Sequence, residues 1–205
     1  MSSEMTGDVQ VRPSLTSHSH FRVAALVSLV QLAIVVLVLN WLGRLWWCPS
    51  GDAAIWISSS ASAHTSQHLF DPYSFSHVCH GLIFAVFLAF VRPSVSVPIR
   101  FTIAMALEGG WEILENTPLV IQRYRDSTAA LGYQGDSIVN SIADILSCAV
   151  GFLIATRIGW RYTLALIGCI ELVMLSTIRD SLLLNVIMLC YPVDAIRQWQ
   201  LSPAN

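Results

Sequence analysis

Long apolar runs, each about the length of a bilayer-spanning helix, constrain the fold of this chain more than any other feature. The first, FRVAALVSLVQLAIVVLVLNWLG at residues 21–43, contains a single charged residue. A helix needs about 20 apolar residues to cross the hydrocarbon core, where every backbone polar group must be hydrogen-bonded internally. Hydrophobic residues make up 55% of the chain and charged residues only 12%, about half the charged fraction of soluble domains. The sequence therefore predicts an integral membrane protein.

Several such segments predict an all-α, polytopic transmembrane helix bundle. The expected spans, about five in number, are residues 21–43, 76–91, 98–117, 136–156 and 160–178. The apolar stretch after Arg179-Asp180 is too short to span and predicts a short apolar C-terminal helix. The expected divisions are a polar N-terminal tail at 1–20, the transmembrane helix-bundle domain at 21–192 and a C-terminal tail at 193–205.

The longer connections, residues 44–75 and the stretch after Pro118, are expected to be polar loops. In the first of them His64, His68 and Asp71 are predicted to be solvated, with a lid over a functional site as the alternative. The five cysteines show neither a CxxC pair nor a metal-binding spacing. They are therefore expected to behave as small hydrophobic residues.

Charge excludes some partners and orients the chain. The net charge is -2 and no basic run is present, so no nucleic acid is expected as a partner. All 11 basic residues are arginines, and six of them lie on the inner side if the N-terminus is inside. This small excess predicts a cytoplasmic N-terminus.

Polar side chains gather on one side of the predicted bundle. Successive spans run antiparallel, so the start of the second, the end of the third, the start of the fourth and the end of the fifth meet on one side. An ionised group in lipid costs at least a few kcal/mol. We therefore expect these groups to face one another in a polar pocket open on one side. The polar residues at the four ends are His77, His80, Glu108, Glu112, Glu115, Asp136, Asn140, Asp144, Glu171, Arg179 and Asp180.

Carboxylates and imidazoles in one pocket are candidates for acid–base catalysis. Helical spacing puts Glu108, Glu112 and Glu115 on one face of the third span. The alternative is a helix end that meets interfacial water, which fits Glu115 better than Glu108 and Glu112. The catalytic candidates are Glu108, Glu112, His80, Asp136 and Asp144.

The same mixture of imidazole and carboxylate suits a divalent metal such as zinc, manganese or iron. No HExxH motif and no Glu-x-x-His pair is present, so hydrogen bonding between helices is the alternative. The expected metal ligands are His77, His80, Glu112 and Asp136.

Arginines on the pocket side are candidates for binding a phosphate-bearing lipid, because guanidinium groups contact phosphate bidentately. Arg123 and Arg125 lie in QRYRD, and Asn140 and Arg179 are further candidates for contact with a substrate. The favoured alternatives are ion pairs with nearby aspartates in a solvated loop and, for Arg179, a structural network with a carboxylate. Gly109-Gly110 in the third span is expected to permit close helix packing.

Four stretches carry a family resemblance: HLFDPYSFSHVCHGLIF, EGGWEILENTPLVIQRYRD, GYQGDSIVNSIADI and IRDSLLLNVIML. They resemble the signature blocks of the uncharacterised alphaproteobacterial family UPF0314, which contains a domain of unknown function. The resemblance covers residues 20–192 and implies a multi-pass protein of the cell inner membrane. A fainter likeness is to VanZ-like membrane proteins, through Asp136, Asn140 and Gly151.

These observations favour an enzyme that uses the carboxylate/His pocket, with or without a divalent metal, on a lipid or lipid-linked substrate. Two other classes stay open. A small-solute or proton-coupled transporter would use intramembrane carboxylates as relays, although such a path needs polar groups at both ends. A non-catalytic membrane assembly protein would use the polar network only to lock its helices together.

Overall fold

The computed structural model describes residues 15–60, 62–130 and 132–202; most of the predicted N-terminal tail, residues 1–14, lies outside them. The regular secondary structure of the described residues is helical, apart from an isolated β-bridge between Trp56 and Phe70. The predicted all-α fold is confirmed. The helices are α1 (Leu15–Trp41), α2 (Ser74–Val91), α3 (Val97–Glu115), α4 (Pro118–Ser127), α5 (Ile138–Ile158), α6 (Trp160–Ile178), α7 (Leu182–Cys190) and α8 (Asp194–Leu201).

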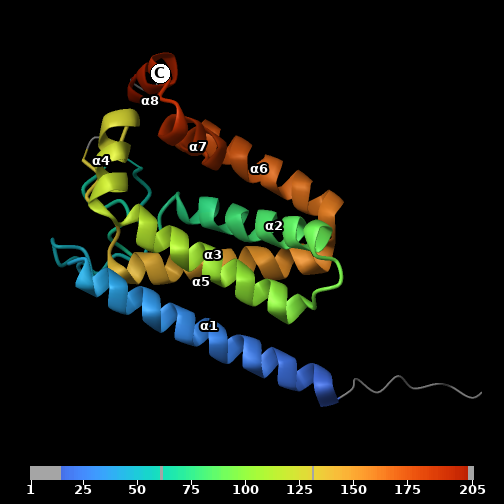
Figure 1. The fold of residues 1–205 in the computed structure, drawn as a ribbon. Coiled ribbons are helices and arrows are strands. Elements are labelled where there is room, and N and C mark those ends of the chain that lie inside the picture. Colours follow the sequence, from blue (N-terminus) through green and yellow to red (C-terminus); the bar gives the residue numbers. More distant parts are fainter. Residues whose placement is uncertain (1–14, 61, 131, 203–205) are drawn as a thin grey trace, which may run out of the picture.

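The long helices α1, α2, α3, α5 and α6 lie side by side and form the bundle (Figure 1). Four of them, α1 from Ser19 onward, α2, α5 and α6, are long and apolar enough to cross a membrane. Helix α3 has 19 residues, a length of about 28 Å, but its arginine and three glutamates lower its hydropathy. It packs against α1, α2 and α5, and this packing buries Glu108 and Glu112 completely. We therefore count α3 as part of the same bundle.

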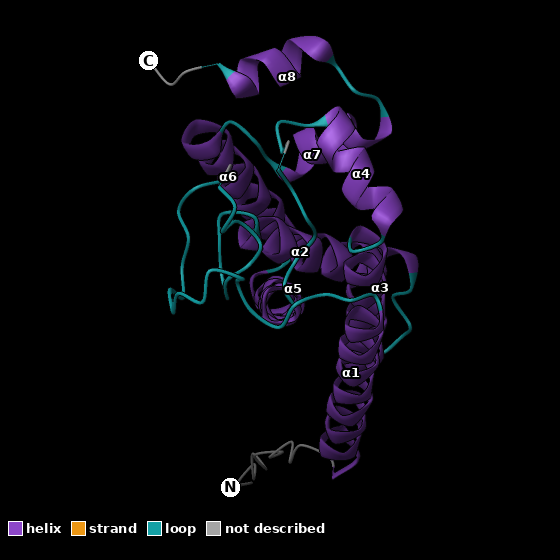
Figure 2. Cartoon of the chain, turned by 90° about the vertical axis from the view of Figure 1, so that its left-hand side faces the viewer, coloured by secondary structure: helices purple, strands orange, loops and turns teal. Residues whose placement is uncertain are grey.

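Helix α5 lies at the centre of the bundle and is seen nearly end-on in Figure 2. It contacts α1, α3 and α6, and packs most extensively on α2. A Cβ atom on Gly81 of α2 would overlap the carbonyl oxygen of Cys148, and one on Gly151 of α5 would overlap that of Val78. These two glycines therefore let the backbones of α2 and α5 touch.

The glycine pair for which close packing was predicted contributes less. A Cβ atom on Gly109 would press only on the Val35 side chain of α1, 2.8 Å away, and one on Gly110 would meet open space. The closest approach in the bundle thus depends on Gly81 and Gly151, each a single glycine in an apolar helix.

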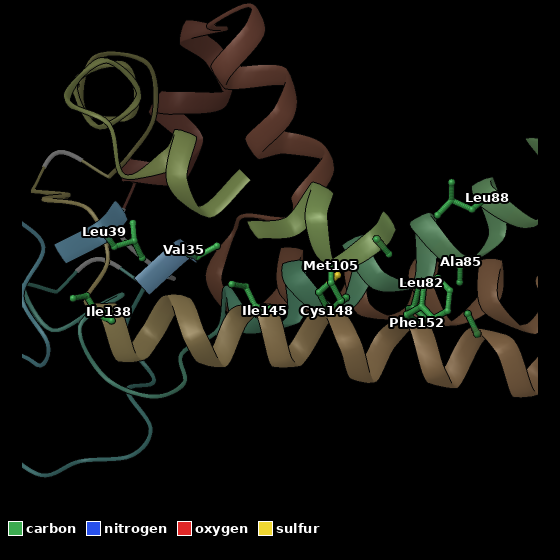
Figure 3. Close-up of a cluster of buried hydrophobic side chains, with 12 residues drawn as sticks. Val35, Leu39, Leu82, Ala85, Leu88, Met105, Ile138, Ile145, Cys148 and Phe152 are labelled. Atoms are coloured by element: carbon green, nitrogen blue, oxygen red, sulfur yellow. The ribbon is translucent and has the colours of Figure 1, made fainter. Parts of the chain in front are cut away.

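Apolar side chains fill the half of the bundle in which α2 ends and α3 begins. Figure 3 shows them pointing toward one another from α2, α3 and α5. The rings of Phe101 and Phe152 meet edge to face with centroids 5.4 Å apart. This half contains the buried residues Leu82, Ala85, Leu88, Ala104, Met105, Cys148, Phe152 and Ala155.

One predicted loop segment is a helix. Residues 118–127 form α4, because Pro118 occupies the first helical position and the Thr117 hydroxyl accepts a hydrogen bond from the Val120 N–H. The loop prediction was wrong because it weighed the polarity of this segment above its capping residues.

The predicted short apolar helix after Arg179 is present as α7. Arg179 itself has φ 55°, in the left-handed region, and ends α6. Helix α8 lies within the segment expected to be a C-terminal tail. Helices α4, α7 and α8 gather near the end of the bundle where α3 finishes and α5 begins (Figure 1).

Candidate functional site

A cavity of about 660 Å³ lies at this end of the bundle. Its wall combines the start of α2, the end of α3, α4, the start of α5, α7 and the loop between α1 and α2. The helix ends that were predicted to meet on one side of the bundle therefore line a cavity. Polar and aromatic side chains that line it include His77, His80, Trp111, Glu115, Tyr124, Tyr133, Asp136, Asp144 and Asp180.

Two histidines in the cavity wall share one buried carboxylate. His77 Nδ1 lies 2.6 Å from Glu108 Oε1, and His80 Nδ1 lies 3.0 Å from Glu108 Oε2. The three residues come together because His77 and His80 are one helical turn apart on α2, facing Glu108 on α3. Glu108 has no exposed surface, so its carboxylate interacts with protein alone.

This geometry orients both imidazoles. An ionised carboxylate only accepts hydrogen bonds, so each Nδ1 must carry the proton that it donates to Glu108. In the neutral ring, Nε2 is then a basic lone pair. In many enzymes a carboxylate bound to Nδ1 orients a histidine in this way, and the histidine then acts as a general base through Nε2.

Two further carboxylates lie next to His77. Glu112 Oε1 is 3.3 Å from His77 Nδ1, and Asp144 Oδ2 is 3.8 Å from His77 Nε2. Both oxygens of Glu112 and Oδ1 of Asp144 are buried without a hydrogen-bond partner. A buried carboxylate without a partner is costly, so Glu112 and Asp144 are candidates for binding a proton, a substrate group or a cation.

The donor set has the composition of a metal site. His77, His80 and Glu108 form one group that could hold a metal ion, and His77, Glu112 and Asp144 form another. The second group is the better fit, because its carboxylates have free oxygens whereas Glu108 is already bonded to both histidines. Of the predicted ligands, His77, His80 and Glu112 belong to these groups, and Asp136 does not.

Asp136 lines the cavity, but its oxygens are already bonded. They accept hydrogen bonds from the Tyr133 hydroxyl at 2.9 Å and from Asn116 Nδ2 at 2.9 Å, and Asn116 Oδ1 in turn accepts from the Asp136 N–H. Asn140 is buried on α5 and donates to the Leu69 carbonyl. These contacts join the loops around the cavity, so the structure gives both residues structural bonds.

The three arginines predicted as possible substrate contacts are not among the residues that line the cavity, and each donates to a backbone carbonyl. Arg123 Nε donates to the Leu189 carbonyl of α7, and Arg125 Nε donates to that of Tyr133. Arg179 Nη1 donates to the Ser202 carbonyl at 2.6 Å. The arginines therefore brace α4, α7 and α8 around the cavity.

Two further expectations differ from the structure. Glu171 does not reach the cavity; it accepts hydrogen bonds from the Leu182 and Leu183 N–H groups, at the N-terminus of α7. The solvated state predicted for His68 and Asp71 was wrong, since they are 1% and 2% exposed.

Asp180, one of the polar residues predicted to gather at the helix ends, does line the cavity, but the sequence did not predict its hydrogen bonds. Asp180 Oδ2 accepts from the Tyr73 hydroxyl at 3.1 Å, just before α2, and from Asn185 Nδ2 of α7. Burial raises the pKa of Asp180 to about 6, although hydrogen bonds from Ser181 and Tyr73 favour the ionised form. Its position after a predicted span was visible in the sequence, but its partner Tyr73 lies 107 residues away along the chain.

Replacing Asp180 by asparagine should change how stability depends on pH. Because its pKa is higher in the folded than in the unfolded chain, the folded state binds more protons between about pH 4 and pH 6. This contribution therefore destabilises the fold as pH rises through that window, by up to about 3 kcal/mol. Thermal unfolding in detergent should show a weaker loss of stability across the window for Asp180→Asn. Equal pH dependence in both proteins would contradict the assignment.

Comparison with known proteins identifies the family. The family described as "Protein of unknown function (DUF2585)" matches residues 39–202. A UPF0314 protein of Sphingopyxis alaskensis is 45% identical over 179 residues, which cover 87% of this chain and 95% of the relative. A UPF0314 protein of Rhizobium meliloti is 45% identical over 175 residues, covering 85% and 89%.

No solved structure matches the chain, and the fainter likeness to VanZ-like proteins finds no support in these matches. The matched segment contains the cavity residues of α2, α3 and α5. The chain belongs to the DUF2585 family of unknown function, together with the UPF0314 proteins of alphaproteobacteria.

Proposed function

We propose that this protein is a multi-pass membrane enzyme that acts on a lipid or lipid-linked substrate by general acid–base catalysis. One observation carries the proposal: a buried carboxylate, Glu108, binds Nδ1 of both His77 and His80 at the wall of a cavity. A purely structural ion pair needs one histidine and no cavity. Paired imidazoles that line a cavity and are held by one carboxylate through Nδ1 are an arrangement for moving protons.

In this proposal the histidines act as bases and Glu108 orients them. His80 or His77 accepts through Nε2 a proton from a water or hydroxyl nucleophile. Glu112, as a carboxylic acid, returns a proton to the leaving group, and Asp144 orients the reacting group or binds a cation. Asp136 and Asn140 keep the supporting roles that their hydrogen bonds indicate.

The cavity wall supports a substrate with both polar and apolar parts. The residues from α7 include Leu182, Val186 and Leu189, and α3 adds the Trp111 ring, which meets His80 edge to face at 6.3 Å. Carboxylates and histidines form a second, polar surface of the same cavity wall. An acyl or polyprenyl chain would lie against the first surface while its head group reaches the second.

The apolar packing beyond the cavity argues against transport. Leu82, Met105 and Phe152 are buried in the half of the bundle that a path to the other face would cross (Figure 3). A relay needs polar groups along its whole length. A non-catalytic assembly role fails to account for the unbonded oxygens of Glu112 and Asp144.

A divalent cation bound by His77, Glu112 and Asp144 is a second form of the proposal, because it would satisfy the unbonded oxygens. In that form His80 alone is the base, since His77 and Glu112 would be ligands. Such an ion supplies Lewis-acid activation of a phosphoryl or carbonyl oxygen. Metal analysis of protein purified without chelators should find an ion that the Glu112→Gln variant loses. Equal metal content in both proteins would restrict the chemistry to proton transfer.

We also propose that the protein lies in the cell inner membrane with its N-terminus in the cytoplasm. Because α1 then crosses the membrane once, the start of α2, and with it the cavity, would lie on the periplasmic side. This location suits a substrate that is exposed at the outer leaflet.

Mass spectrometry of lipids and lipid-linked intermediates tests the function. Cells that lack the protein should accumulate one lipid class, and wild-type protein should restore its level. His80→Gln should fail to do so, whereas Gly110→Ala should succeed because its Cβ meets open space on the same bundle. Unchanged lipid profiles with an altered soluble-metabolite distribution across the membrane would instead support transport.

A further inference from the structure

A second group of metal-binding side chains lies in the loop between α1 and α2, apart from the histidines of the proposed catalytic centre. It consists of Cys48, Asp52, His64 and His68, whose ligand atoms all lie within 4.8 Å of one another. The first two follow α1 directly, whereas the two histidines lie more than ten residues later. Their spacing follows no common motif, so only the fold brings them together.

The distances between the donor atoms fit one tetrahedral ion. His64 Nδ1 lies 3.4 Å from Cys48 Sγ, 3.3 Å from His68 Nε2 and 3.0 Å from Asp52 Oδ2. Asp52 Oδ1 lies 3.4 Å from His68 Nε2. Ligands held about 2.0–2.3 Å from a tetrahedral zinc ion are roughly 3.3–3.8 Å apart. These distances are close to those that a zinc ion requires, and all four ligand atoms lie within 4.8 Å of one another.

The surroundings fix the chemical state of His68. Its Nδ1 lies 2.7 Å from the Ala54 carbonyl oxygen, which can only accept, so Nδ1 carries the proton and Nε2 is the lone pair directed at the cluster. A zinc-binding histidine usually donates its other nitrogen to a backbone carbonyl in this way. The Trp47 ring packs edge to face on His68 and its Nε1 donates to the Asp52 carbonyl, which holds the two ligands in place.

More potential partners surround the Nδ1 atom of His64 than one ring nitrogen can bond. Nδ1 of His64 has a thiol, a carboxylate and a second imidazole nitrogen within 3.4 Å, yet a single ring nitrogen can make one good hydrogen bond. His68 has a fully buried side chain and Cys48 is also buried. A divalent cation satisfies all four donors simultaneously.

We propose that Cys48, Asp52, His64 and His68 bind a structural zinc ion. The thiolate, the carboxylate and two imidazoles together form a closed four-ligand set, which is typical of a structural zinc site. The proposal is independent of the proposed enzymatic function, since none of these residues belongs to the His77 and Glu108 network.

The zinc ion would hold the loop over the cavity. The cavity wall includes residues that lie between the ligands along the chain, namely Ser62, Thr65 and Ser66. The loop is joined to the start of α5 by hydrogen bonds from the Ser137 N–H to the Ser66 carbonyl and from Gln67 Nε2 to the Gly135 carbonyl. Zinc would therefore stabilise the cavity's mouth without taking part in the chemistry inside it.

Cobalt substitution tests the site on the full-length protein in detergent. Cobalt bound to a thiolate gives a sulfur-to-metal charge-transfer absorption, which the His77, Glu112 and Asp144 group cannot produce because it contains no sulfur. The wild type should show this band and bind zinc, and Cys48→Ser should lose the band and one zinc ion per chain. Cys169→Ser is the matched control, because Cys169 is an exposed cysteine outside the cluster, and should keep both. A band that persists in Cys48→Ser would overturn the proposal.

Alkylation of wild-type protein gives a test that needs no variant. Zinc should protect Cys48 from iodoacetamide, and a chelator should make it reactive, as measured by mass spectrometry of the peptide that contains it. The Glu112→Gln variant should show the same protection, which separates this ion from one in the cavity. No zinc in the purified protein after zinc loading, together with reactivity that a chelator does not change, would refute the site.

Discussion

The Glu108→Gln variant is expected to fold and to lose catalytic turnover on the order of 100-fold or more, the usual contribution of a general base. Glutamine keeps the shape of the side chain but offers one acceptor oxygen in place of two. His77 and His80 both bond this group in the wild type. In the variant the amide nitrogen must face one of the rings, which then carries its proton on Nε2 and loses its basic lone pair.

Nitrogen NMR of histidine-labelled protein measures this change without a substrate. Wild-type protein should show His77 and His80 in the same tautomer, protonated at Nδ1, and Glu108→Gln should change the tautomer of one of them. The conservative variant Glu108→Asp, which keeps two oxygens, should retain both signals more fully. Identical spectra in wild type and Glu108→Gln would exclude Glu108 as the residue that orients the histidines.

Gly81→Ala is expected to have the largest effect on stability. The added Cβ atom would overlap the backbone carbonyl oxygen of Cys148, which cannot move without displacing α5. Overpacking usually costs about 1–3 kcal/mol, and a clash with backbone belongs at or above the upper end of that range. Because α2 carries His77 and His80, the same displacement would also separate them from Glu108.

Gly110→Ala is the matched control, since its added Cβ atom meets nothing within 4 Å. Size-exclusion chromatography after heating should find Gly81→Ala aggregated at a temperature where wild type and Gly110→Ala are intact. Gly151→Ala should behave like Gly81→Ala, because its Cβ atom would overlap the Val78 carbonyl oxygen. Wild-type stability in both glycine variants would mean that α2 and α5 do not pack as described.

The sequence predicts the bundle and the polar end of it well, because both follow from rules that act along the chain. Apolar segments of spanning length indicate the helices, and their antiparallel order brings the histidines of α2 to the glutamates of α3. What the sequence does not predict is which oxygens remain unbonded. The difference between Asp136, bonded to Tyr133 and Asn116, and Asp144, with a free oxygen, depends on contacts between distant segments.

Sequence patterns predict the structure and contacts of the loops least well. Residues between α1 and α2 have no periodic apolar face, so nothing local predicts that His68 is buried against Trp47 or lies beside Cys48. The arginines of α4 illustrate the same limit. Their charge suggested an ion pair with a nearby aspartate or, as the less favoured alternative, anion binding, but Arg123 donates to the Leu189 carbonyl of α7, 66 residues away.

Conversion of a lipid by the purified protein tests the central claim most directly. Lipids extracted from cells that lack the protein are supplied to wild-type, Glu108→Gln and Gly110→Ala protein in lipid nanodiscs, and the products are analysed by mass spectrometry. The account predicts that wild type and Gly110→Ala consume the accumulated lipid, whereas folded Glu108→Gln consumes it at least about 100-fold more slowly. Equal conversion by Glu108→Gln, or no conversion by the wild type, would contradict it.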